Sequence, residues 1–336
     1  FTGTDPDEEL VQVRVDWGDG EVSAWSSLVP SGTAVVQTHT FRLPGKYLLR
    51  AIARDQRGKL GVWTEIQIVE VEGDPAVQFL TPPYLQNVKP DGITIMWECD
   101  VAVDGEVRYG SGPTPAGLQP ATTVASGGGT YIYKAVLRGL LPGTVYPYEV
   151  RVGGAALPAG TFTTAPLGHG EFAFAVWADS QGSNHGAYGP DPLEPTTSMM
   201  RHMGLSGIQF AVGAGDHAEN GGSYSDTRQY YLDRVARWLG SAVPWYVAWG
   251  NHDGGRGTVI RKFADLPSQE RSGFDAGYGS YSFDYAGCHF ICIDYATAVG
   301  DIRTWLEADL RSEANRNARF TFLFVQIGRA SCRERV

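Results

Sequence analysis

The sequence predicts a multidomain protein in which two all-β sandwiches precede an α/β layered domain that is incomplete at its C-terminal end. Two observations support the sandwiches: short runs of alternating apolar and polar residues, and turn-forming Gly and Pro clusters spaced regularly between them. A third observation supports the α/β domain, because near-continuous apolar runs alternate with helical periodicity after residue 170. We therefore expect domains at residues 1–72, 76–166 and 170–326.

The first domain contains two strand-like runs, Leu10–Val15 and Tyr47–Ala53, separated by turn residues. Asp16–Gly20, His39–Phe41 and Pro44–Tyr47 together resemble the polycystic-kidney-disease (PKD) type of immunoglobulin-like domain. The resemblance implies a spacer or adhesion module of extracellular proteins, without catalysis.

The second domain follows the linker Val71–Pro75 and contains short, evenly spaced runs, as expected for a sandwich: Ile93–Trp97, Gly105–Tyr109, Tyr131–Leu137 and Val145–Val152. We expect its many aromatic residues to fill the core rather than to form a carbohydrate-binding face. Three segments resemble the fibronectin-III-like N-terminal domain of purple acid phosphatases: Pro83–Gln86, Leu140–Tyr146 and Phe162–Pro166.

The third domain has apolar runs typical of strands buried on both faces: Phe172–Trp177, Ile208–Val212, Trp245–Trp249, Phe290–Ile293 and Phe320–Val325. Helical spacing is found between them, at Leu232, Val235, Trp238 and Leu239, and again at Ile302, Trp305, Leu306 and Leu310. Ligands in such folds bind beyond the carboxyl ends of the strands.

Polar residues follow three of these strands: Asp179-Ser180-Gln181, Gly215-Asp216 and Gly250-Asn251-His252-Asp253. A carboxylate can bridge two cations, an amide oxygen is a neutral ligand, and glycine lets the backbone turn tightly. Two metal ions about 3.5–4 Å apart lower the pKa of a shared water and clamp a phosphoryl group. These residue types at neighbouring strand ends are therefore suited to binding metal ions.

The order and spacing of these blocks resemble the calcineurin-like metallophosphoesterase superfamily. The resemblance implies that Asp179 binds one metal, Asp216 bridges both and Asn251 binds the second. It also implies that His252 lies over the substrate phosphate, that Asp253 orients its imidazole, and that a metal-bound hydroxide is the nucleophile. Carboxylate, amide and imidazole ligands suit two divalent or trivalent ions of Fe, Mn or Zn better than Ca.

Several residues depart from the superfamily pattern. Gln181 stands where many relatives have His, and together with Asn220 it is expected to contact substrate or support the ligands. Glu219 stands where purple acid phosphatases have a tyrosine, so we expect no purple colour. We interpret His217 as a local residue, His289 as a core histidine and His185 as a loop residue beside the cleft.

The last ten residues, 327–336, resemble the translation of a sequencing adapter, so we expect the native sequence to stop at Gln326. The superfamily's remaining metal-binding histidines would follow that point. We therefore expect this chain to bind metal weakly and to hydrolyse substrate poorly.

Composition excludes several classes of protein. The net charge is −10, and it becomes −12 when the tail's three Arg and one Glu are left out. This acidity disfavours binding to nucleic acid, which depends on Lys and Arg. No apolar run is long enough to span a bilayer. Cys99, Cys288 and Cys292 are expected to be buried thiols.

The predicted function is metal-dependent hydrolysis of a small phosphate monoester by an extracellular or periplasmic protein. Within the enzyme class, the alternative is a phosphodiesterase or nucleotidase, because the same metals serve both reactions. The alternative from another class is a non-catalytic extracellular binding protein whose phosphoesterase domain is degenerate.

Overall fold

The computed structural model divides the chain into two compact units, Phe1–Gln78 and Phe79–Val336. The described residues are 1–18, 22–41, 45–65, 67–72, 77–110, 117–181, 195–240, 242–255, 257–267, 279–297 and 299–326. The predicted adapter-like tail at 327–336, the loop residue His185 and part of the linker at 71–75 lie outside these ranges.

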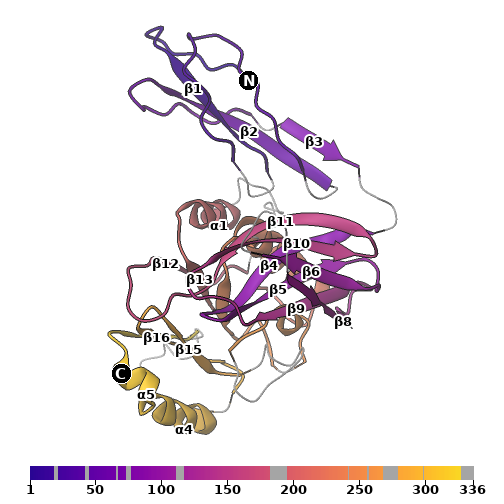
Figure 1. Cartoon of the computed structure of the whole chain (residues 1–336), viewed down its shortest axis with the longest axis vertical. Coiled ribbons are helices and arrows are strands. Elements are labelled where there is room, and N and C mark those ends of the chain that lie inside the picture. The colour runs from indigo at the N-terminus through magenta and orange to yellow at the C-terminus, as the bar shows by residue number, and fades with distance from the viewer. Residues whose placement is uncertain are drawn as a thin grey trace, which may run out of the picture. The chain divides into compact units, whose positions relative to one another are not determined.

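The first unit contains an antiparallel sheet of three strands (Figure 1), formed by β1 (Val11–Asp16), β2 (Gly45–Asp55) and β3 (Gln67–Val71). Both predicted runs of this region therefore form strands. Alternation along β1 places Val11, Val13 and Val15 inside. The core cluster of the unit consists of Val13, Val15, Trp17, Val35, Tyr47, Leu49 and Ala51.

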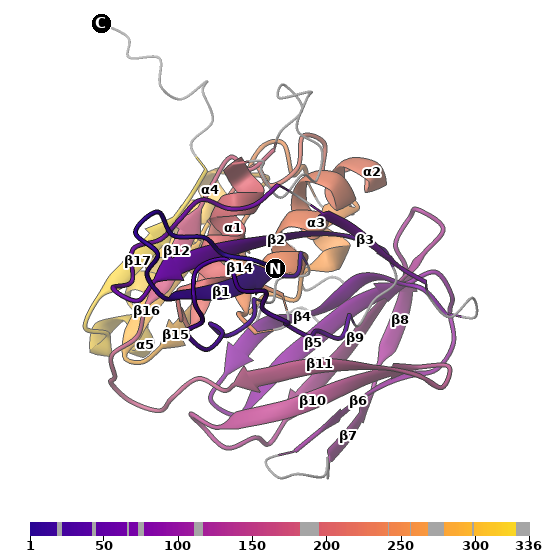
Figure 2. The same ribbon diagram turned by 90° about the horizontal axis from the view of Figure 1, so that it is seen from above.

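The second unit begins with a sandwich of two four-stranded antiparallel sheets, ordered β4-β5-β9-β8 and β11-β10-β6-β7 (Figure 2). Its strands are β4 (Phe79–Lys89), β5 (Gly92–Cys99), β6 (Gly105–Tyr109), β7 (Gly117–Pro120), β8 (Thr122–Ala125), β9 (Tyr131–Arg138), β10 (Val145–Val152) and β11 (Ala155–Thr163).

Aromatic side chains fill the interior of this sandwich. Trp97 stacks on Tyr133 with ring centroids 5.2 Å apart, and Tyr146 stacks on Phe162 at 5.4 Å. All four side chains are buried. For these residues, the prediction of a core role rather than a carbohydrate-binding face is confirmed.

Strand β5 is buried at every residue, although a sandwich strand usually alternates between core and solvent. The outer face of its sheet is covered by the region that follows in the chain. Tyr84 donates a hydrogen bond to the carbonyl of Phe263 at 2.9 Å, and Gln86 donates to the carbonyl of Trp245 at 3.0 Å. The sandwich and the following region therefore form one packed unit.

That region contains two further three-stranded sheets. The first is parallel and consists of β12 (Phe174–Trp177), β13 (Phe210–Ala214) and β14 (Trp245–Ala248). The second consists of β15 (Tyr281–Tyr285), β16 (Cys288–Cys292) and β17 (Thr321–Phe324), with β16 and β17 parallel. Aromatic contacts join the two sheets: Phe210 meets Phe290 edge to face at 5.2 Å, and Tyr246 stacks on Phe283 at 3.7 Å.

Helices connect these strands. They are α1 (Pro195–Leu205), α2 (Tyr224–Asp226), the π-helix η2 (Thr227–Leu232), α3 (Asp233–Trp238), the 3-10 helix η3 (Ile260–Phe263), α4 (Val299–Leu310) and α5 (Glu313–Asn317). Two of the helical segments, the one from η2 to α3 and the one at α4, lie where the periodicity predicts them. None of the helices in the described ranges has the length and apolar composition needed to cross a bilayer.

Two strands differ from the prediction that all apolar runs are buried on both faces. In β12, Val176 is half-exposed, and in β17, Phe322 and Phe324 are only partly buried while Leu323 is exposed. Each of these strands lies at the end of its sheet and pairs with a single neighbour among the described strands. The strands β13 and β14 are buried as predicted. Strand β14 also pairs with a single neighbour, but β4 of the sandwich packs against it, where Gln86 donates to the carbonyl of Trp245.

The three cysteines Cys99, Cys288 and Cys292 are buried free thiols, as the sequence predicts. Burial raises the pKa of the Cys292 thiol to about 12. A buried thiol held in its neutral form is a poor nucleophile.

Candidate functional site

The predicted site residues follow the carboxyl ends of the parallel strands. Asp179 comes two residues after β12, Asp216 two residues after β13, and Asn251 three residues after β14. Register pairs Trp177 with Gly213 and Ala214 with Ala248, so the three strands end at one edge of the sheet. Gln326 follows β17 and reaches the same place from the other sheet.

Both aspartates have a left-handed backbone, with φ of 52° at Asp179 and 53° at Asp216. Non-glycine residues adopt this conformation at a cost of about 1 kcal/mol or more, and such residues cluster at functional sites. Neighbouring loops hold the conformation in place. Asp179 donates its N–H to the carbonyl of Gly215 at 3.0 Å, and Gln181 donates its N–H to the carbonyl of Asp216 at 3.1 Å.

The two carboxylates converge on one point. The Gln326 side-chain amide donates to Asp179 Oδ1 at 3.0 Å and to Asp216 Oδ2 at 2.9 Å. The other oxygen of Asp216 accepts the backbone N–H of His252 at 2.9 Å. Gly250 allows this approach, because a Cβ at that position would lie 2.1 Å from Asp216 Oδ1.

Asp253 binds the backbone of the site rather than the imidazole of His252. It is fully buried, and its carboxylate accepts N–H groups from Asp216 and Gly250 on one oxygen and from His217 and Ala218 on the other, at 2.8–3.3 Å. Burial raises the pKa of the Asp253 carboxyl, although these N–H groups oppose the shift. Asp253 therefore ties the loop after β13 to the loop after β14.

The imidazole of His252 is instead oriented by a carbonyl group. Its Nδ1 lies 2.9 Å from the backbone oxygen of Glu219. A carbonyl can only accept, so Nδ1 carries the proton and Nε2 is the atom left for a ligand. The hydrogen bond to Glu219 raises the pKa of His252, with smaller contributions from the charges of Asp216, Glu219 and Asp253.

The structure also shows the surroundings of three other residues considered in the sequence analysis, which are Gln181, Asn220 and His217. The backbone N–H of Gln181 bonds to the carbonyl of Asp216 at 3.1 Å, and its buried side-chain Oε1 has no hydrogen-bond partner among the described residues. Asn220 is exposed, and its Oδ1 accepts the N–H of Gly222 at 3.0 Å, so it stabilises a turn. His217 is buried with Nε2 3.2 Å from the carbonyl of Ala248, which agrees with a local role.

His289 has the predicted role of a satisfied core histidine. It is buried, with Nδ1 2.7 Å from Asp284 and Nε2 2.9 Å from Asp309. His289 lies within β16, and its contact with Asp309 joins this strand to helix α4. It does not support the residues at the strand ends.

Three contributions to the site are not predicted from the sequence. Gln326 bridges the carboxylates, and its place directly after a predicted strand is the one available signal. Arg234 donates to the carbonyl of Ser180 at 2.6 Å. Arg261 binds Asp294 through two nitrogens at 2.5 and 2.8 Å and also donates to the carbonyl of Gly254.

The donor set fits a cation in part. Among the described residues, no three His, Cys, Asp or Glu side chains are grouped closely enough to hold a metal ion. Nevertheless, Asp179 and Asp216 direct carboxylate oxygens at one point, and the unpartnered oxygen of Gln181 lies in the adjoining loop. Oxygen donors of this kind, together with Asn251, suit a hard or borderline divalent ion.

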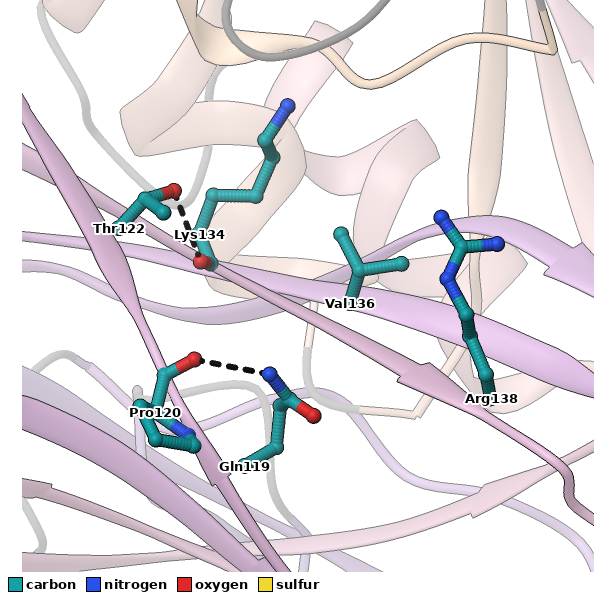
Figure 3. Close-up of a pocket in the computed structure, with 6 residues that line it drawn as sticks. All are labelled: Gln119, Pro120, Thr122, Lys134, Val136 and Arg138. Carbon is teal, nitrogen blue, oxygen red and sulfur yellow. Dashed lines mark hydrogen bonds between the residues drawn. The ribbon is translucent and has the colours of Figure 1, made fainter.

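A pocket of about 340 Å³ lies on the sandwich and is lined by Gln119, Pro120, Thr122, Lys134, Val136 and Arg138 (Figure 3). Figure 3 shows the Lys134 amine pointing away from Gln119 and Pro120, and its Nζ forms an ion pair with Asp265 at 3.1 Å. None of the predicted site residues lines this pocket.

Comparison with known proteins matches residues 83–164 to the purple acid phosphatase N-terminal domain. No curated protein matches the chain. The structure of PhoD is 17% identical over 77% of this chain and 64% of its own, with a TM-score of 0.49. The chicken CNTN1 FN1-FN3 domains are 16% identical over 46% of this chain and 52% of theirs, with a TM-score of 0.18.

The chain thus spans less than two thirds of the length of either solved structure. Both TM-scores lie below 0.5, so the fold assignment depends on the family match and on the observed sheets. The three segments that resemble this family in the sequence, at Pro83–Gln86, Leu140–Tyr146 and Phe162–Pro166, begin within the matched range. Residues 83–164 form a fibronectin-III-like sandwich of the purple acid phosphatase N-terminal type.

Proposed function

We propose that this chain carries the metallophosphoesterase region of a phosphate-ester hydrolase, with an α/β layered domain at 170–326. The observation that carries the proposal is the convergence of Asp179, Asp216 and the His252 backbone at adjacent strand ends. The family match of the preceding sandwich adds independent support, because that domain type belongs to phosphatases by its description.

The ligands of the proposed site would be Asp179, Asp216 and Asn251, with Asp216 shared between two ions of Fe, Mn or Zn. When bound, these ions would supply an activated water and neutralise phosphate charge. The observed geometry supports Asp179 and Asp216 as ligands of one ion, because an oxygen of each meets the Gln326 amide, while the His252 N–H holds the other oxygen of Asp216.

His252 has the geometry of a group that binds phosphate and protonates a leaving oxygen. Nδ1–H is held by the Glu219 carbonyl, and the ring is partly exposed, so Nε2 is available to substrate. The pKa of His252 is raised, which favours the imidazolium form that both roles require. Asp253 fixes the loop on which His252 stands.

The proposed substrate is a small phosphate monoester, hydrolysed outside the cytoplasm. We also propose that residues 1–72 are a PKD-type spacer, on the basis of the Asp16–Gly20, His39–Phe41 and Pro44–Tyr47 pattern. The purple acid phosphatase-type sandwich at 83–164 and the preceding β-structured unit support the proposal of an extracellular or periplasmic protein.

The test is hydrolysis of 4-nitrophenyl phosphate and of bis(4-nitrophenyl) phosphate with added Mn²⁺, Zn²⁺ or Fe²⁺. We expect weak metal-dependent turnover that favours the monoester. Asp216→Asn should lower this turnover at least about 100-fold, because losing a metal ligand should reduce activity more than losing a group that only supports a ligand. Asp301→Asn, on the exposed first turn of α4, is the matched control and should have no effect.

Turnover that is independent of metal, or unchanged in Asp216→Asn, would overturn the proposal. Preference for the diester would reassign the substrate class. Absence of metal binding by titration calorimetry, together with absence of turnover, would favour a non-catalytic binding protein.

A further inference from the structure

The sandwich contacts the loops of the candidate site through a buried carboxylate. Glu98 on β5 is fully buried, and it accepts hydrogen bonds from Tyr224 Oη at 2.6 Å and from Arg228 at 2.7 Å. The hydroxyl groups of Thr81 and Thr130, also on the sandwich or its hairpin, complete the surroundings of the carboxylate.

Tyr224, the first residue of α2, directly follows the segment that orients His252. This segment, residues 219–223, starts at Glu219, whose carbonyl faces His252 Nδ1. At its centre, Gly221 donates its N–H to the carbonyl of His252 and accepts the N–H of Ile260, both at 2.9 Å. The segment is therefore fixed to the His252 loop on one side and, through Tyr224, to the sandwich on the other.

The hairpin between β8 and β9 is shaped to receive this tyrosine. A Cβ at Gly128 would lie 2.2 Å from the Tyr224 ring, so a residue larger than glycine would displace the ring. Lys262, on η3 downstream of His252, donates to the carbonyls of Ala125 and Ser126 at 3.3 Å. The hairpin thus contacts one segment that precedes His252 in the sequence and one that follows it.

The chemistry of the contact favours a fixed geometry. Burial, followed by the hydrogen bond to Glu98, raises the pKa of Tyr224 to about 12, so the phenol stays neutral and donates. A buried carboxylate that loses a donor is left incompletely solvated, so each donor is strongly held. Arg228 also binds the carbonyl of Leu80 at 2.8 Å on β4.

We propose that the sandwich is a positioning element of the site: Glu98, through Tyr224, holds segment 219–223 and thereby keeps the Glu219 carbonyl on His252. The proposal rests on the proposed function for its catalytic consequence. Glu98 and Tyr224 are positioning residues, since neither contacts the strand-end carboxylates.

A second ion pair between the sandwich and the same region provides a matched control. Asp265 binds Lys134 at 3.1 Å and Thr94 at 2.6 Å, and both partners belong to the sandwich. Asp265 follows η3, and among the described residues it forms no hydrogen bond with segment 219–223. Asp265→Asn removes a charge as Glu98→Gln does, without releasing Tyr224.

The test compares the full chain with its Glu98→Gln, Tyr224→Phe and Asp265→Asn variants by amide hydrogen exchange. We expect exchange in residues 219–223 to rise at least about tenfold in Glu98→Gln and Tyr224→Phe, as loss of a hydrogen bond to a charged group allows. Asp265→Asn should leave this segment protected. For 4-nitrophenyl phosphate, the first two variants should lower kcat more than they raise KM.

Equal protection of residues 219–223 in all four proteins would overturn the proposal. A loss of protection in Asp265→Asn as large as that in Glu98→Gln would also overturn it. If Glu98→Gln does not fold, Tyr224→Phe, which removes a single hydroxyl group, decides the result. The exchange measurement needs no turnover, so an inactive wild-type protein would refute the proposed function while leaving this test intact.

Discussion

At the scale of single residues, Asp253 is the group that joins the two central loops of the site. Its two oxygens accept four backbone N–H groups, from Asp216, His217, Ala218 and Gly250. These donors belong to the ends of β13 and β14. A carboxylate is required because each of its oxygens must accept two hydrogen bonds.

We predict that Asp253→Asn lowers the free energy of unfolding by about 3 kcal/mol, because one amide NH₂ would then face buried donors instead of accepting from them. Urea unfolding followed by tryptophan fluorescence measures the change. Asp301→Asn on exposed α4 is the control and should change stability by less than about 0.5 kcal/mol. A similar small change for Asp253→Asn would contradict a joining role.

His289 provides a second prediction at this scale, which concerns pH. The imidazole lies between Asp284 on β15 and Asp309 on α4, and Ser282 also donates to Asp309 at 2.6 Å. Burial lowers the pKa of His289, but the two carboxylates outweigh it and raise the pKa above its ordinary value. The folded state therefore binds the proton more tightly than the unfolded chain does.

The stabilisation by His289 should be complete below the unfolded pKa of about 6.5 and should disappear as pH rises through the higher folded pKa. Urea unfolding of wild type and His289→Gln at pH 5.5, 7.0 and 8.5 measures this. The difference in unfolding free energy between the two proteins should shrink with increasing pH. A difference that is constant over this range would show that the histidine is neutral throughout.

The residues of the site show what local sequence can predict. Asp179, Asp216 and His252 follow apolar strands directly, so their gathering at one sheet edge follows from the strand order of a parallel sheet. Gln326 and the carbonyl of Glu219 were not predictable in this way. Their contacts depend on how two sheets and two loops pack, which no spacing within the chain encodes.

At the scale of elements, the sequence predicts best those strands whose apolar residues and flanking turn residues are visible within the run itself. The runs Gly105–Tyr109 and Val145–Val152 coincide with β6 and β10. The helical spacing from Leu232 to Leu239 coincides with the end of η2 and with α3, but the π-helical turn itself is not predicted. The partial exposure of β12 and β17 was also not predictable, since it depends on which elements pack against each strand and not only on its place in the sheet.

The continuous burial of β5 has an energetic consequence for the polar residues that it carries. Its polar residues Thr94 and Glu98 face the following region and pair with Asp265 and Arg228. Such groups are tolerated in a buried face only when they are paired. The interface between sandwich and α/β region is therefore specific as well as apolar.

We predict that Lys134→Met lowers the free energy of unfolding by about 3 kcal/mol, because the buried Asp265 carboxylate then loses its cation. The double variant Lys134→Met/Asp265→Leu should recover part of the loss, since no unpaired charge remains buried. Urea unfolding of the three proteins measures both effects. A single variant as stable as wild type would show that the pair contributes little.

At the scale of the whole molecule, the two compact units differ in how they are built. The first unit has its own core, with Val15 fully buried among Trp17, Tyr47 and Leu49. The second unit contains both the sandwich and the α/β region, which the Lys134–Asp265 and Arg228–Glu98 pairs join. Cooperative unfolding should follow these units rather than the three predicted domains at 1–72, 76–166 and 170–326.

Calorimetry of the full chain should therefore show two transitions, and a core substitution should identify which residues each one contains. Val15→Ala should lower the stability of its unit by about 2 kcal/mol. For a unit of this size, this corresponds to a fall in Tm of about 8–16 °C. Val150→Ala in the sandwich and Val247→Ala in the α/β region should both act on the other transition, which should fall by about 4–8 °C in either case. If the latter two substitutions moved different transitions, the sandwich would unfold apart from the α/β region, and its buried ion pairs could not be the permanent link that positions the loops of the site.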